Sequence, residues 1–249
     1  MNRTIALLLI LIPLCGFSQK KPMVKVKKAQ PYYVGGYAGL ASGEGTYREA
    51  GYLDGIYVNV EVGRFFHPRF AVIAKVGLYY LEVDRDLYSL NFRDMYHLSS
   101  DYKPSAYFGK GESNWPMYVR IGPWLSTPVH PKLAIDLKIL AGVQAYNYTP
   151  SGGLSRQING IEEKYYIGRV DVNPDFVIDI GVDVKLKIHK RVKLSLNTDF
   201  IYTNQHIREY VHFSKNDVFV NKTYFNYTQQ VLVFNIGVGA VYIIDRRQW

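Results

Sequence analysis

One segment of the chain alternates between apolar and polar side chains over a greater length than an ordinary globular strand. Its apolar side chains occupy every second position: Phe176, Ile178, Ile180, Val182, Val184, Leu186 and Ile188. The positions between them are mostly charged or small, with Val177 as the exception. Because successive residues of a strand point to opposite faces, this segment has one apolar face and one charged face. The pattern resumes after Lys190 and Arg191, which predicts a long hairpin.

The same alternation identifies eight candidate strands. Their predicted ranges are 32–41, 56–66, 70–82, 117–126, 133–148, 176–189, 192–204 and 230–244. The connections between them alternate in length. Three are tight, at 67–69, 127–132 and 190–191, and the other four are long, at 42–55, 83–116, 149–175 and 205–229. Short periplasmic turns at one end and long external loops at the other are typical of transmembrane β-barrels with an even number of antiparallel strands.

A lipid environment requires such strands to close into a ring. In hydrocarbon every backbone N–H and C=O needs a partner within the protein, so an open sheet edge is not tolerated. The sequence therefore predicts an all-β fold over residues 32–249, a closed eight-stranded antiparallel up-and-down transmembrane β-barrel. The rival fold is a soluble lipocalin-like barrel with its apolar face inside, because periodicity alone does not assign the inward face. The unequal connections and the unbroken apolar stripe favour the membrane barrel.

Residues 1–18 have the pattern of a cleaved signal peptide. Arg3 supplies the positive start, a ten-residue apolar stretch follows from Ile5 to Leu14, and small residues at Gly16 and Ser18 predict cleavage after Ser18. The alternative is a lipoprotein signal acylated at Cys15, which Leu14 fits poorly because a small residue normally precedes that cysteine. The sequence thus predicts export to the outer membrane of a Gram-negative bacterium.

The net charge of +9 is concentrated before the predicted barrel. Six positive charges precede the first acid, Glu44, and leave the rest of the chain at only +3; they are Arg3, Lys20, Lys21, Lys25, Lys27 and Lys28. Residues 19–31 therefore predict a basic, disordered periplasmic leader. We expect no nucleic-acid partner, since that function needs basic residues spread over a folded face. The single cysteine lies within the signal peptide, so disulfides are not expected.

The polar parity of the strands predicts the content of the barrel interior. Ten charged residues, five acids and five bases, have this parity: Glu61, Lys75, Arg120, Asp136, Lys138, Asp179, Asp183, Lys185, Lys193 and Asp199. Opposite charges in a narrow tube can pair, whereas unpaired buried charges would each cost several kcal/mol. Eight strands enclose a space that side chains can just fill. We therefore expect a packed polar core in place of an open pore.

Aromatic residues on the apolar parity cluster near the strand ends. Near the long connections these are Tyr80, Trp115, Phe176 and Tyr202; near the short turns they are Phe66, Phe70 and Tyr242. Amphipathic rings favour the headgroup level of a bilayer, so the two sets predict two aromatic girdles. The alternative is that tyrosine-rich strands are common in any sheet.

Three segments resemble small outer-membrane β-barrel proteins of the kind common in Bacteroidota, with an OmpX-like architecture. They are the Tyr/Gly-rich segment 32–39, the hairpin 63–70, and the closing strand with Asn235, Gly237, Ala240 and Tyr242. The closing strand resembles the signal that the barrel-assembly machinery reads, which implies contact with that machinery during biogenesis. The chain departs from the pattern because Asp245 to Gln248 separate this strand from the terminal Trp249.

Enzymatic and metal sites find little support in the sequence. The six histidines include no pair at a typical metal-ligand spacing with a carboxylate partner, so we expect neither a metal nor a cofactor. The tripeptides His97-Leu98-Ser99 and His212-Phe213-Ser214 have the His-x-Ser pattern of lipid A deacylases. Both fall in predicted loops, whereas a catalytic triad needs rigid support, so we expect no catalytic residues.

The leading functional hypothesis is a non-enzymatic barrel with a structural or interaction role, such as an accessory subunit of an envelope complex for secretion, assembly or uptake. Its expected partners are outer-membrane lipid and a protein bound by the external loops. Loop 83–116 favours protein contact because it interleaves aromatic residues with charges. The alternatives are a narrow, porin-like channel and a lipid A-modifying enzyme.

Overall fold

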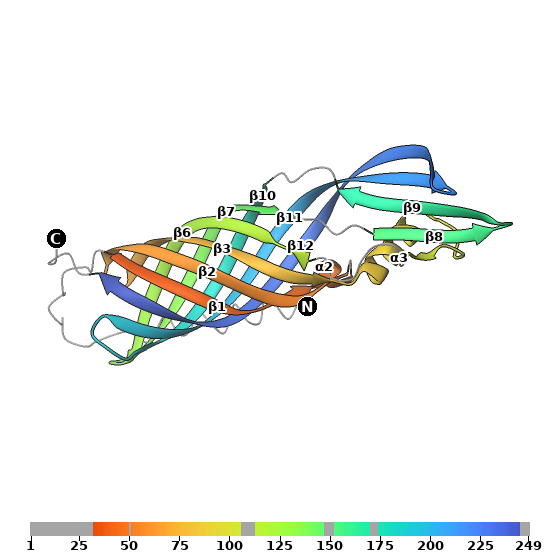
Figure 1. Cartoon of the computed structure of the whole chain (residues 1–249). Coiled ribbons are helices and arrows are strands. Elements are labelled where there is room, and N and C mark those ends of the chain that lie inside the picture. The colour runs from red at the N-terminus through yellow and green to blue at the C-terminus, as the bar shows by residue number, and fades with distance from the viewer. Residues whose placement is uncertain (1–31, 50, 106–112, 147–151, 170–173, 245–249) are drawn as a thin grey trace, which may run out of the picture.

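Eight antiparallel strands of the computed structural model form a ring (Figure 1). The structure describes residues 32–49, 51–105, 113–146, 152–169 and 174–244. The ring strands are β1 (Tyr32–Glu44), β2 (Tyr52–His67), β3 (Phe70–Val83), β6 (Pro116–His130), β7 (Leu133–Tyr146), β10 (Asp175–Lys187), β11 (Val192–Lys215) and β12 (Val218–Ile244). Their order is β10-β7-β6-β3-β2-β1-β12-β11, and the pairing of β10 with β11 closes it. The predicted all-β, antiparallel up-and-down arrangement with a ring of eight strands is confirmed.

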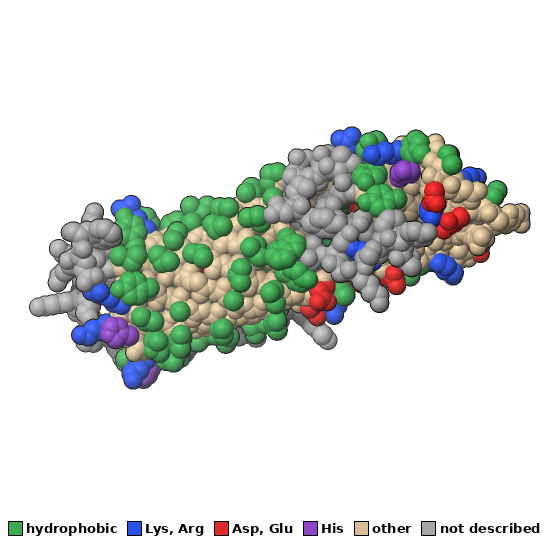
Figure 2. All heavy atoms as spheres, in the orientation of Figure 1, with side chains coloured by type: hydrophobic (Ala, Val, Ile, Leu, Met, Phe, Trp, Pro, Cys, Tyr) green, Lys and Arg blue, Asp and Glu red, His purple; other side chains and the backbone are tan. Residues whose placement is uncertain are grey.

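The apolar face of the ring points outward. Along β10 the exposed side chains include Ile180 and Val182, while Asp179 and Asp183 are fully buried inside. Green apolar side chains accordingly cover the barrel wall in Figure 2. The lipocalin-like alternative, which requires the opposite orientation, is therefore wrong. No helix in the described part of the chain is long and apolar enough to cross a membrane.

The tight turns lie together at one end of the ring, here called the turn end. They join β2 to β3, β6 to β7 and β10 to β11. Strand β10 stops at Lys187, two residues before the predicted end at His189, because the chain bends from Ile188 onward. The predicted signal peptide and leader, residues 1–31, and the tail 245–249 lie outside the described residues.

The long connections at the other end are not the loops that the sequence predicts. Strands β11 and β12, which are 24 and 27 residues long, continue past the ring as one hairpin, and this end of the molecule has further elements. These are α2 (Thr46–Glu49), α3 (Arg85–Met95), β4 (Lys103–Pro104), β5 (Ser113–Asn114), β8 (Gly152–Ile158) and β9 (Ile161–Arg169). The extended hairpin, β9, β8 and β4 pair in that order into a sheet. We call this sheet, together with α3, the head (Figure 1).

Two asparagine-led turns explain why these segments become hairpins. Asn159 and Gly160 join β8 to β9, and Asn216 and Asp217 join β11 to β12. All four residues have positive φ, between 47° and 77°. Two consecutive residues with positive φ match the right-handed twist of the strands that they connect, and asparagine and glycine adopt this conformation most readily.

Helix α3 closes one side of the head. It begins where the Asp84 carboxylate accepts a hydrogen bond from the Leu87 N–H at 2.9 Å. Its buried residues Tyr88 and Phe92 pack in a cluster with Leu154 of β8, Ile167 of β9 and Val211 of β11. The head thus has an apolar core of its own, separate from the interior of the ring.

Candidate functional site: the barrel interior and the head

Nine of the ten charged residues predicted for the barrel interior are at most 1% exposed, and all nine point into the ring. The tenth, Lys193, is half-buried near the turn end. Five carboxylates and four cations therefore share a space enclosed by the strand backbones. This number of buried charges is tolerable only where the charges are paired.

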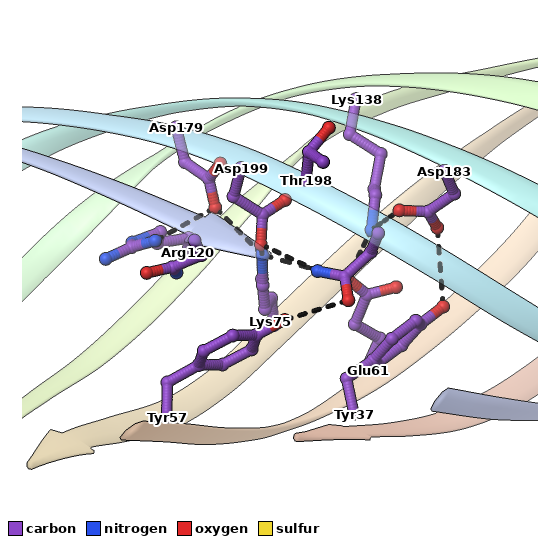
Figure 3. A network of polar contacts seen from close by, with 12 residues as sticks. Tyr37, Tyr57, Glu61, Lys75, Arg120, Lys138, Asp179, Asp183, Thr198 and Asp199 are labelled. Atoms are coloured by element: carbon purple, nitrogen blue, oxygen red, sulfur yellow. Dashed lines mark hydrogen bonds and ion pairs between the residues drawn. The ribbon is translucent and has the colours of Figure 1, made fainter. Parts of the chain in front are cut away.

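Lys75 forms the centre of this network (Figure 3). Its Nζ lies 2.5 Å from an oxygen of Asp199 and 3.1 Å from an oxygen of Asp179. Arg120 approaches the same Asp179 at 2.9 Å. Strands β3 and β11, which carry Lys75 and Asp199, lie opposite one another in the ring order, so this contact crosses the full width of the tube.

A second group of ion pairs lies nearer the turn end. Lys138 Nζ is 2.7 Å from Glu61 and 2.9 Å from Asp183. Lys185 lies 2.9 Å from Asp136 and 3.2 Å from the same Asp183. The two groups also meet, since Lys75 is 3.9 Å from Glu61. The nine charges form one connected network along the tube.

Tyrosines fill the space between these charges, and the sequence pattern had not led us to expect them there. Tyr57 donates to Asn197 at 2.8 Å and Tyr37 to Asp183 at 3.4 Å, each across the tube. Arg120 lies 3.8 Å from the ring centroid of Tyr118 and donates to the Tyr79 hydroxyl at 3.1 Å. Parity could have identified Tyr57, Tyr79 and Tyr118 as inward, because each is an even number of positions from a buried polar residue of its strand, Tyr118 from Arg120 for example.

The tube is also packed with rings toward the turn end. Trp124, 2% exposed, contacts Tyr33 at 5.2 Å and Phe65 at 4.9 Å between ring centroids. A Cβ atom on Gly63 would lie 2.0 Å from the Tyr33 ring, so only glycine leaves room for this ring. Side chains from opposite walls therefore meet at successive levels of the interior.

The predicted girdle residues lie on the outer surface at the two ends of the ring. Phe66, Phe70 and Tyr242 are 40–57% exposed and lie near the turn end. At the head end Tyr80 and Trp115 form an edge-on pair at 4.9 Å. Phe176 and Tyr202 lie at the same end, on β10 and β11; Phe176 is 63% exposed and Tyr202 half-buried.

The head presents a face of stacked aromatic and cationic side chains. Lys222 lies 4.0 Å from the ring centroid of Tyr210 and 5.3 Å from that of Tyr224. Arg208 approaches Tyr224 at 5.3 Å, and Tyr166 lies 5.8 Å from Tyr210. Phe225 packs toward α3, so the adjacent Tyr224 points to the opposite side of the sheet. We call the five residues Tyr166, Arg208, Tyr210, Lys222 and Tyr224 the ladder face.

A carboxylate joins the strands of the head. The Glu163 carboxylate accepts a hydrogen bond from the Tyr102 hydroxyl at 2.7 Å and another from the Arg156 Nε–H at 2.7 Å. Lys215 Nζ lies 3.0 Å from the same carboxylate. These contacts, the Tyr102 hydrogen bond first, lower the pKa of Glu163 to about 2. Burial, and after it the same hydrogen bond, raises the pKa of Tyr102 above its usual value.

A cavity of about 410 Å³ lies between the head and the mouth of the ring. Its lining includes Tyr88 and Phe92 of α3, Glu209 of β11 and Tyr227 of β12. The Tyr88 hydroxyl donates to the Glu209 carboxylate, which is 3% exposed. The sequence pattern placed both residues in loops; it gave Tyr88 to the aromatic loop 83–116 that was expected to contact a protein, and indicated no role for Glu209.

The two His-x-Ser tripeptides both belong to the head. The Ser99 hydroxyl donates to Asp101 at 3.0 Å, and the ring of His212 packs edge-on against Phe219 at 4.7 Å. Among the described residues, no hydrogen bond joins either histidine to its serine. No group of three or more His, Cys, Asp or Glu side chains suited to a metal ion occurs in the part of the chain that the structure describes.

No protein-family model matches the chain, and no curated protein matches its sequence. Among solved structures the chain is similar to Neisserial surface protein A, with 9% identity over 88% of this chain and 100% of that one and a TM-score of 0.49. The chain is also similar to a major outer membrane protein of Thermus thermophilus, with 11% identity over 88% of this chain and 100% of that one and a TM-score of 0.47. OprG of Pseudomonas aeruginosa, also an outer membrane protein, has 9% identity over 87% and 98%, with a TM-score of 0.35. At these identities and TM-scores the likeness carries no conclusion about ligand, partner or activity.

Proposed function

We propose that this protein is a non-enzymatic outer-membrane barrel of a Gram-negative bacterium. In this proposal a non-conducting barrel anchors the head outside the membrane, and the ladder face binds a protein partner. The protein then acts as an accessory subunit of an envelope complex. The observation that carries the proposal is the combination of a filled tube with a folded head.

The interior contacts support a barrel that does not conduct. A channel needs a continuous aqueous path, whereas here Lys75 reaches Asp199 from the opposite wall and Tyr57 reaches Asn197. A tube filled by nine paired charged side chains leaves no open path for ions, which suits a barrel that anchors the head. Purified protein in a planar bilayer is therefore expected to give no conductance steps, and regular steps would refute this part of the proposal.

The composition of the ladder face supports binding to a protein. Tyrosine and arginine are the residue types that most often dominate interface energetics, and here they form a preordered surface. The pairing of Tyr210 with Lys222 and of Tyr224 with Arg208 fixes these side chains before any partner arrives. A preordered face loses less conformational entropy on binding.

Site-specific photocrosslinking in living cells tests the binding role. A photoreactive residue replaces Tyr224, which is 48% exposed on the ladder face, and in a matched control it replaces Val182, which is 37% exposed on the barrel wall. We expect a discrete protein adduct from position 224 and lipid adducts from position 182. The adduct should disappear when Tyr210→Ala and Lys222→Ala are added.

Two outcomes would contradict the proposal. One is an adduct that survives the double ladder-face change, which would place recognition elsewhere. The other is the absence of any discrete protein adduct at position 224 in correctly folded barrels. Unchanged lipid A profiles are expected for Ser99→Ala and Ser214→Ala, and an altered profile would instead support the enzyme alternative.

A further inference from the structure

Among the described residues, the exposed charges at the turn end of the barrel all have the same sign. Six cationic residues lie on or beside its three tight turns, and we call them the cationic rim: Arg64, Arg69, Lys132, Lys187, Lys190 and Arg191. The described residues of this end, 32–36, 62–72, 123–135, 184–195 and 239–244, contain no aspartate or glutamate. In Figure 2 this end of the visible face accordingly has blue and purple side chains but no red ones.

The head end has a different charge distribution. Exposed acids such as Asp54 and Asp217 accompany the cations there, and they form ion pairs with Arg48 at 3.3 Å and Lys164 at 2.8 Å. The single sign of the rim is therefore a property of one end and does not follow from the average composition of the surface. Like charges on one surface repel, so an anionic ligand bound among them would lower that repulsion.

Arg64 indicates where that ligand sits. It has the lipid-facing parity of β2, between the exposed Val62 and Phe66, so its side chain lies outside the tube. The guanidinium lies 5.5 Å from the ring centroid of Phe66 and 5.9 Å from that of Tyr32. Exposed aromatic rings mark the headgroup level of a bilayer. Arg64 is thus held at the depth where lipid phosphates lie.

We propose that the cationic rim binds the phosphates of anionic phospholipids in the membrane leaflet next to the turn end. The guanidinium of Arg64 can donate two parallel hydrogen bonds to a phosphate, and the remaining cations around the rim supply the surrounding positive field. Six cations on three separate turns suit several lipid molecules arranged around the barrel. This inference rests on the proposed membrane-spanning role, and it is independent of the proposed non-conducting and partner-binding roles.

Native mass spectrometry of the full chain tests the inference. The protein is reconstituted in equal amounts of phosphatidylglycerol and phosphatidylethanolamine, extracted in mild detergent, and the lipids that remain bound are identified. The wild type is expected to retain phosphatidylglycerol preferentially. In Arg64→Gln with Arg69→Gln this preference should fall about twenty-five-fold, since each of the two cations near a membrane surface contributes on the order of a factor of five.

Matched variants separate the rim from general effects of charge. Arg48→Gln with Lys103→Gln removes two exposed cations at the head end and should leave the preference unchanged. Lys187→Gln with Lys190→Gln repeats the test on another turn, in case the first rim variant fails to fold. Equal retention of both lipids by the wild type, or an equal loss in rim and head variants, would overturn the inference.

Two further arms identify the source of the phosphate. If inorganic phosphate displaces the retained lipid with the same dependence on Arg64, the rim is a general phosphate site and the lipid assignment is wrong. Sedimentation with isolated peptidoglycan that depends on the rim residues, without any lipid preference, would also overturn it. A barrel that inserts and gives no conductance but shows no lipid preference would refute only this inference and leave the proposed function intact.

Discussion

Replacing Lys75 with methionine tests the energetic role of the interior network. The change removes the ammonium that lies 2.5 Å from Asp199 and 3.1 Å from Asp179. Asp179 keeps Arg120 at 2.9 Å, but Asp199 keeps, among the described residues, only the weaker hydrogen bond from the Asn197 amide at 3.2 Å and the attraction of Lys138 without a direct ion pair. Breaking one side of a buried ion pair typically costs about 3–5 kcal/mol, and we expect that loss here.

The double variant Lys75→Met with Asp199→Asn is the matched control. It removes both members of the closest pair and leaves the net charge of the interior unchanged. Replacing a whole buried pair is often nearly neutral, so the double variant should regain at least about 2 kcal/mol relative to the single one.

Reversible urea unfolding in lipid vesicles measures both values. Tryptophan fluorescence is a suitable signal, since Trp124 is buried in the tube and Trp115 is 43% exposed on the outer surface. The free energies of unfolding follow from linear extrapolation. A single variant within about 1 kcal/mol of the wild type would refute the reasoning, because the buried carboxylate would then be tolerated without its partner.

Three further predictions concern the head and the close packing of the tube. The pKa of Glu163 is about 2 in the folded head and about 4.3 in an unfolded chain. Its contacts therefore stabilise the head fully above about pH 4.3, and this stabilisation is lost as the pH falls toward about 2. Glu163→Gln should therefore cost about 1–3 kcal/mol at neutral pH and remove this dependence, as measured by hydrogen exchange in β8 and β9. Gly63→Ala, with a Cβ 2.0 Å from Tyr33, should destabilise the barrel by about 1–3 kcal/mol, whereas Gly36→Ala, with nothing within 4 Å, should not; equal urea midpoints would contradict the packing argument. Asn216→Val, at φ 47°, should fray the tip of the β11–β12 hairpin by about 1–2 kcal/mol and leave the exchange of the ring strands unaltered.

The ring could be predicted from the sequence because a barrel wall with an apolar outer face and a polar inner face imposes a period of two. Each ring strand has one mainly apolar face, so residues such as Ile180 and Asp183 receive their places from parity alone. The network partners could not be predicted, since which of Lys75 and Lys138 meets which carboxylate depends on the stagger of strands far apart in the chain. The inward tyrosines were missed because residue type suggested the lipid face while parity indicated the interior.

The head could not be predicted by the same reasoning. Both faces of the β11–β12 extension carry aromatic and polar residues, so residues 205–229 have no apolar stripe and were predicted to be a loop. The signal that was available is local: Asn159-Gly160 and Asn216-Asp217 are two-residue hairpin turns between segments rich in β-branched and aromatic residues. How β8 and β9 then dock on β11 depends on tertiary contacts such as Leu154 against Tyr88.

The unbroken course of β11 and β12 gives the protein a mechanical property. Strand β1 pairs with β12 only as far as Leu232, and the fourteen residues from Val218 to Val231 extend the hairpin beyond that point by about 45 Å. No hinge separates the two parts of these strands in the register of the hairpin, whose one irregularity is near its tip at Phe213 and Ser214. A force applied to the head is therefore transmitted along the axes of β11 and β12 to the barrel wall. There it acts in shear on many ladder hydrogen bonds at the same time. Such a stalk is stiffer than a flexible tether of the same length, because its backbone is held in a continuous hydrogen-bonded ladder.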